Sequence, residues 1–236
     1  MSKNKTNMEP SQIYRSMMLE IKLRIRSIDN CISNSGINLQ TFDVEFCFLQ
    51  FRKIVEQICF ASIICDQNRY EDFRLLEGET DDKDSGDYTQ DWNARIILKK
   101  LNDISPHFMP RPLGNKTSNN GAHHFELKDI NATHNKLISI YKKCGGFMHI
   151  PRPFGEDYEA HILKQRDRYK SSVETIRNYS KYFKELLWNH AAMGLEYNKN
   201  NGEFESLEIS NTKNAWLINF KDYASDEIEI IIAVAE

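Results

Sequence analysis

The chain has 236 residues, a formal net charge of −3 and a pI near 6.2, with 40% hydrophobic and 11% aromatic residues. This composition is typical of a folded protein with one large core and excludes a wholly disordered chain. It also excludes the global basic field that draws many proteins onto nucleic acid, although a local basic surface remains compatible with it.

The polar start of the chain, residues 1–10, lacks the apolar core of a signal peptide and is expected to be disordered. The most apolar stretch, residues 44–65, is interrupted by charged side chains, so we expect no membrane span. Five cysteines without a pairing rhythm are best explained as free thiols in a reducing compartment. The sequence therefore predicts a cytoplasmic protein.

Two strong helices are predicted near the start of the chain. Isoleucines recur at helical spacing through residues 11–33, which indicates an amphipathic helix. Residues 43–65 are apolar almost all round, as in a helix at the centre of a bundle, with Asp43 as the expected N-cap.

Three further helices are expected before residue 190. One is capped by Asp91 and runs to about residue 104, one runs from Thr133 to the Gly145-Gly146 pair, and a long one covers residues 156–189. The intervening segments read as loops: an acidic one at 77–90 and a proline-containing one at 105–125.

The tail changes to the alternating and β-branched pattern of strands, at 193–197, 204–209, 215–220 and 228–234. The predicted fold class is therefore mainly α (α+β), with a helical bundle over residues 11–190 and a C-terminal antiparallel β-sheet over residues 191–236. The last strand is markedly apolar, and its edge is expected to pair with a partner or with a second copy.

Arg52 and Glu56 are the first candidate site residues. They lie four residues apart in an otherwise apolar helix and therefore share one helix face. Burying ions is costly unless they are paired, so this position needs an explanation. The pair is either a structural ion pair, part of a solvent-facing stripe with Lys53, or the lining of a polar pocket.

Tyr141 and His149 are the second pair of candidates, in the segment YKKCGGFMHIPRPF. His149 stands in an apolar setting followed by two prolines, where it is either a general acid or base, an RNA-contacting group, or a core histidine bonded to a backbone carbonyl. Lys142, Lys143 and Arg152 in the same segment are candidate binding residues for phosphate groups.

The segments FLQFRKIVEQICFASII and IYKKCGGFMHIPRPF together resemble a set of uncharacterised bacterial proteins. In helical character the chain is also similar to the HEPN superfamily (higher eukaryotes and prokaryotes nucleotide-binding), many of whose members are RNA-cleaving toxins or defence proteins. HEPN nucleases carry an arginine four to six residues before a histidine, whereas here Arg52 and His149 would have to meet in space.

Two functions follow as expectations. The first is the binding or regulation of a partner by a bacterial helical-bundle protein. The resemblance implies that this protein is a subunit of a defence or toxin-related system. The alternative is a metal-independent endoribonuclease in which His149, Arg52, Glu56 and Tyr141 form the catalytic centre. We expect a protein partner or self-association, with RNA as a further candidate partner, and neither a cofactor nor a metal, because no phosphate loop, hydrolase elbow or complete metal-ligand pattern is present.

Overall fold

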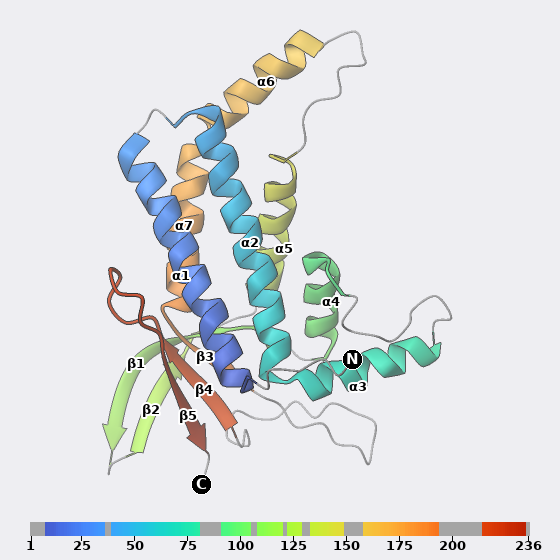
Figure 1. Ribbon diagram of the computed structural model, residues 1–236, viewed down its shortest axis with the longest axis vertical. Helices are drawn as coiled ribbons and strands as arrows, with labels where there is room; N and C mark the ends of the chain where they lie inside the picture. The colour runs from blue at the N-terminus through green and yellow to red at the C-terminus, as the bar shows by residue number, and fades with distance from the viewer. Residues whose placement is uncertain are drawn as a thin grey trace, which may run out of the picture.

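The protein folds into a helical bundle with an antiparallel sheet at one end, as Figure 1 shows for this computed structural model. The described residues are 8–35, 39–80, 91–104, 108–119, 122–128, 133–148, 158–193 and 214–234. The predicted fold class, mainly α with a sheet late in the chain, is confirmed. Of the predicted disordered start, residues 1–7 lie outside the described residues.

The long helix α2 (Thr41–Cys65) forms the centre of the bundle. It packs against α1 (Pro10–Ser35), α4 (Ala94–Ile104), α5 (Thr133–Gly145) and α7 (Val173–Leu187). Its almost uniformly apolar sequence suits this position, because neighbours on several sides bury several of its faces. The helices predicted at 11–33, 43–65 and 133–145 therefore form with nearly the expected bounds.

Two predicted helix caps are wrong. Asp43 is the third residue of α2, where its Oδ2 accepts a hydrogen bond of 3.0 Å from the backbone N–H of Gln40, the residue before the helix. Asp91 lies outside α4 and accepts hydrogen bonds from Tyr70 Oη at 2.7 Å and Arg74 Nε at 2.9 Å. Both carboxylates therefore satisfy donors other than those expected for an N-cap.

The predicted long helix over residues 156–189 is two helices, α6 (Tyr158–Lys170) and α7. At the break, the hydroxyls of Ser171 and Ser172 both donate to the carbonyl of Arg168, at 3.0 and 2.6 Å. Such local bonds compete with the helical backbone pattern, which explains an interruption without glycine or proline. A further helix, α3 (Gln67–Thr80), takes up the start of the predicted acidic loop, and residues 81–90 lie outside the described residues.

The sheet has the strand order β2-β1-β3-β4-β5, and all neighbouring strands are antiparallel. The strands are β1 (Arg111–Asn119), β2 (Ala122–Leu127), β3 (Asn189–Met193), β4 (Asn214–Asn219) and β5 (Glu229–Val234). The loop predicted at 105–125 is thus wrong, because most of it forms the β1–β2 hairpin. The strand predicted at 204–209 lies outside the described residues.

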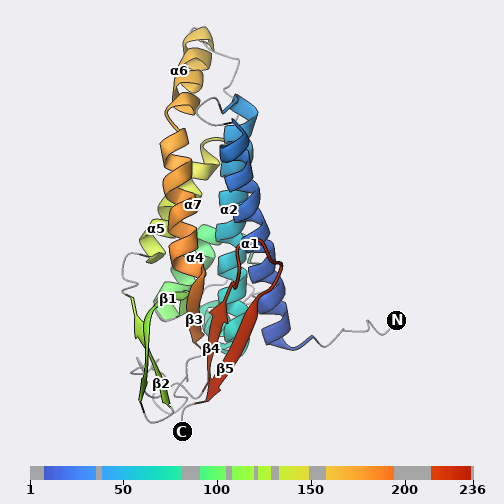
Figure 2. The same cartoon turned by 90° about the vertical axis from the view of Figure 1, so that its left-hand side faces the viewer.

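Helix α1 joins the sheet to the bundle, as Figure 2 shows from the side. Near its start, Tyr14 packs edge-on against Trp216 of β4, with ring centroids 5.6 Å apart, and Arg15 Nε donates to the carbonyl of Ile228 at 2.8 Å. Further along, α1 packs against α2. The buried apolar residues of helices and sheet consequently form one continuous core.

Candidate functional site

The structure brings Arg52, Glu56 and Tyr141 together at the contact between α2 and α5. Arg52 Nε lies 3.1 Å from Glu56 Oε1, and Arg52 Nη2 donates a hydrogen bond of 2.6 Å to Tyr141 Oη. The guanidinium carbon also lies 4.4 Å from the centroid of the Tyr141 ring. The candidate residues from two distant segments are therefore in direct contact.

This Arg52 cluster lies at the surface of the bundle, with 28% of the Arg52 side chain and 18% of the Glu56 side chain exposed. Lys53 Nζ also reaches Glu56, at 3.4 Å. Burial raises the pKa of the Tyr141 hydroxyl, and the positive charge of Arg52 partly offsets that rise. Among the described residues, Arg52 and Glu56 thus form a partly exposed ion pair to which Lys53 also contributes.

The turn after α5 is held against the same region. A Cβ atom added to Gly145 would lie 3.5 Å from Arg52 Nη1, so the helix end comes close to the guanidinium there. Phe147 stacks on Phe48 with centroids 3.8 Å apart, and the guanidinium carbon of Arg168 lies 3.9 Å from the centroid of the Phe147 ring. Arg168 Nη1 also donates to the carbonyl of Gly146 at 3.0 Å, which fixes the direction in which the chain leaves α5.

His149 and Arg152 lie just beyond this turn, outside the described residues, which stop at Met148 and resume at Tyr158. The expected meeting of Arg52 and His149 stays a prediction. So does the contribution of Arg152 to a binding surface.

Lys142 and Lys143 are both exposed on α5. Lys143 Nζ lies 3.4 Å from Thr175 Oγ1 and 6.0 Å from the ring of Tyr179, both on α7. Residues two apart on a helix point in nearly opposite directions, so Lys143 projects to a different side of α5 than Tyr141. The structure therefore separates Lys143 from the Arg52 cluster.

An exposed apolar stripe on α2 leads directly to the Arg52 cluster. Phe42, Phe46 and Leu49 are 80%, 39% and 40% exposed. Their spacing of four and then three residues places them on one helix face, and Arg52 and Lys53 follow on the next turn. The predicted bundle-centre helix over residues 43–65 did not reveal the exposure of Phe46 and Leu49, because a nearly uniform apolar pattern does not show which face of a helix is left uncovered.

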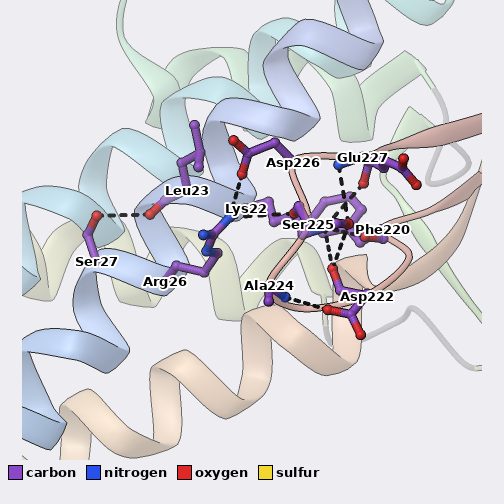
Figure 3. Close-up of polar contacts among 10 residues, drawn as sticks. All are labelled: Lys22, Leu23, Arg26, Ser27, Phe220, Asp222, Ala224, Ser225, Asp226 and Glu227. Atoms are coloured by element: carbon purple, nitrogen blue, oxygen red, sulfur yellow. Dashed lines mark hydrogen bonds and ion pairs between the residues drawn. The ribbon is translucent and has the colours of Figure 1, made fainter.

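A second polar centre was missed entirely, around Lys22 of α1 (Figure 3). Its side chain is fully buried, and Nζ donates to the carbonyls of Phe220 at 2.5 Å, Asp222 at 2.7 Å and Glu227 at 3.2 Å. Burial lowers the pKa of the ammonium, as does Arg26, while nearby carboxylates raise it. We call this the Lys22 clamp, because it holds the loop between β4 and β5 against α1.

His190 of β3 forms another buried centre. Its Nδ1 lies 2.8 Å from the carbonyl of Leu187 and its Nε2 lies 2.7 Å from Tyr14 Oη. A carbonyl only accepts, so Nδ1 carries the proton and Nε2 accepts from Tyr14. Burial lowers the pKa of His190 to about 4, with the Leu187 hydrogen bond opposing part of that shift, so the imidazole is neutral.

Neither centre offers an open reaction site, because Lys22 and His190 are both fully buried and bonded to the protein. Among the described residues, no three His, Cys, Asp or Glu side chains gather to hold a metal ion. In that same part of the chain, no helix has the length and apolar character needed to cross a membrane. No family model, no curated protein and no solved structure matches this chain.

Proposed function

We propose that the protein works by binding a partner protein, as a regulatory or structural subunit. The binding surface is the face of α2 formed by Phe42, Phe46, Leu49, Arg52 and Lys53, which we call the α2 binding surface. The observation that carries the proposal is the row of three exposed apolar side chains that ends at two cations.

The apolar half of this surface has the spacing of helix recognition. Single exposed apolar residues are ordinary, but Phe42, Phe46 and Leu49 form a row at positions i, i+4 and i+7. A row of this kind presents anchors to an amphipathic helix that lies along it. The partner we propose is therefore a helix with an apolar face.

The charged half indicates what that partner helix carries. Arg52 and Lys53 share one carboxylate, Glu56, so one positive charge in this group of three is not balanced within it. Among the described residues, Arg52 Nη1 makes no hydrogen bond, whereas Nε and Nη2 are engaged. An aspartate or glutamate on the partner helix, one turn after its last apolar residue, would accept a charge-assisted hydrogen bond from Arg52 Nη1.

The setting we propose for this binding is a defence or toxin-related assembly. It rests on the resemblance of two sequence segments to uncharacterised bacterial proteins and on the similarity in helical character to the HEPN superfamily, many of whose members are toxins or defence proteins, and not on the geometry of the surface.

A display library of amphipathic helical peptides tests the proposal with defined probes. Peptides selected on the wild-type protein are expected to carry an apolar face with Asp or Glu one turn away, and to bind more weakly as salt rises. Phe46→Glu and Arg52→Gln should each weaken the selected peptides at least tenfold in calorimetric titrations. Leu163→Glu, an equally drastic change at a 59% exposed position of α6, should leave their affinity unchanged.

Two outcomes would refute this surface: selected peptides without an acidic preference, or peptides that bind Phe46→Glu as tightly as wild type. Circular dichroism of each variant shows whether a loss of binding reflects a loss of fold.

A second function, endoribonuclease activity, is favoured by one contact. Arg52 lies against Gly145, only four residues before His149. In this alternative, His149 moves the proton of the 2′-hydroxyl and Arg52 stabilises the charge of the phosphorane, while Tyr141 and Glu56 hold Arg52 in place. Lys142 and Arg152 would then contact RNA phosphates, and Lys143, on another side of α5, would meet only a more distant phosphate.

Labelled RNA incubated with wild type, His149→Ala and Arg52→Ala separates the two functions. Cleavage by wild type that is lost in both variants would replace the binding proposal. Absence of cleavage by wild type would refute the nuclease alternative.

A further inference from the structure

The last strand of the sheet, β5, has an outer edge without a strand partner in the described part of the chain. It pairs with β4 over six residues, from Glu229 opposite Asn219 to Val234 opposite Asn214, without a bulge. The strand order ends at β5. As far as the described residues go, its outward-pointing backbone N–H and C=O groups can therefore accept another strand.

This strand also lacks the usual protection of a sheet edge. Its sequence, EIIIAV, contains no lysine and no proline, and its one charged residue, Glu229, is neutralised by an ion pair with Lys221. Natural edge strands that stay unpaired commonly carry such charges, prolines or bulges. Ile231 is 52% exposed, whereas Ile230 packs against the core.

We propose that β5 pairs with β5 of a second copy of this chain, antiparallel and across a twofold axis at Ile231. Along β5, every second residue points its backbone N–H and C=O away from β4. In an antiparallel pair with another β5, each of these residues must lie opposite a residue of the same kind, because the two exchange their hydrogen bonds. Because these residues alternate along the strand, a twofold axis has to pass through a residue facing its own copy. Of the β5 side chains that the structure describes, Ile231 is the exposed apolar one, so it gains most from this position.

The resulting register is free of charge conflict. Ile230 lies opposite Ile232 of the partner subunit, and Glu229 lies opposite Ala233 of the partner subunit, so no like charges face each other. Leu217 is the β4 neighbour of Ile231 and its side chain lies on the same sheet face. The pairing therefore joins Leu217 and Ile231 of both copies into one apolar row.

The self-complementarity of β5 favours a second copy over a foreign strand. The same residue meets itself at the axis, and the isologous contact uses one β5 edge from each copy, so it closes after two subunits. The Lys22 clamp fixes the loop that enters β5, so the strand is already in position before a partner arrives. This contact lies at the opposite end of the molecule from α6 and does not depend on the α2 binding surface (Figures 1 and 2).

Sedimentation velocity over a wide concentration range tests the dimer on the full chain. Wild type should reach twice the mass of one chain, and Ile231→Lys should stay monomeric, because two ammonium groups would face each other at the axis. Leu163→Lys, at a similarly exposed position on α6, should dimerise like wild type, and so should Phe46→Glu. A wild type that is monomeric at every concentration, or an Ile231→Lys variant that still dimerises, would overturn the proposal.

Cysteine substitution tests the register independently of any loss of fold. Ile231→Cys places two thiols directly opposite each other, about 4.5–5.5 Å apart at Cβ, within reach of a disulfide with slight adjustment. Mild oxidation should therefore link this variant as a dimer, whereas Glu229→Cys, whose thiol faces Ala233 of the partner subunit, and wild type should stay unlinked. Equal cross-linking of Glu229→Cys would show association without this register and would refute the twofold pairing at Ile231.

Discussion

The Lys22 clamp and the Arg52 cluster place cations in two different ways, on neighbouring helices of one bundle. Lys22 is fully buried, and three backbone carbonyls accept from its ammonium. Arg52 is 28% exposed, is held by two side chains, and keeps one nitrogen without a hydrogen bond among the described residues. The first arrangement stabilises the fold, and the second leaves binding capacity at the surface.

The largest expected effect comes from Lys22→Met, which keeps an unbranched side chain one atom shorter than lysine but removes its donors. Three carbonyls would lose their common partner inside the protein, and we expect a loss of about 3 kcal/mol in the free energy of unfolding. Urea denaturation followed by Trp188 and Trp216 fluorescence measures it. Arg26→Met is the matched control, because its partner Asp226 is 69% exposed, and it should cost less than about 1 kcal/mol. Equal losses for the two variants would contradict the contrast between buried and exposed cations.

The pH dependence of stability extends the comparison to His190. Its pKa in the folded protein is about 4, below the ordinary value of 6.5, so the unfolded chain takes up the proton first as pH falls. Stability is therefore complete above about pH 6.5 and decreases toward pH 4, by about 3 kcal/mol at most for this one group.

The control for this prediction is His190→Gln, which has no titrating group. The urea midpoints of wild type and variant should converge as pH falls from 7 to 5, a range in which most carboxylates stay ionised. Parallel curves would show that His190 is not a buried neutral imidazole.

The smallest effect is expected for Arg52→Met. The ion pair with Glu56 is partly exposed and solvent-screened, so the free energy of unfolding should fall by less than about 1 kcal/mol. Without the positive charge that lowers it, the pKa of Tyr141 should rise further, which spectrophotometric titration of tyrosine measures. A loss as large as that of Lys22→Met would make Arg52 a structural residue and would remove the charged half of the α2 binding surface.

Much of the helical body is predictable from the sequence, because its helices bury one periodic face or nearly all faces. The β1–β2 hairpin is not, since RPLGNKTSN contains proline and glycine and lacks the alternation that marks a strand. The break between α6 and α7 was not predicted either, because two serine side chains produce it and neither glycine nor proline marks it in the sequence.

The polar centres also differ in how far the sequence reveals them. Arg52 and Glu56 are recognisable as charges within an apolar helix, and the structure places both beside Tyr141. Lys22 stands in a helix with many charges, so its burial has no local signature. Its partners are backbone carbonyls about two hundred residues away. Every residue has a backbone carbonyl, so the sequence does not indicate which ones accept from Lys22.

The Lys22 clamp also orders events during synthesis. The helix that supplies the ammonium leaves the ribosome early, whereas the loop that receives it emerges 198 residues later at Phe220. Until then the first helix carries a hydrated lysine on the face meant for the interior, and it cannot complete its packing. Translation that stops before the final hairpin would therefore yield a loosened bundle, an evident substrate for quality-control proteases.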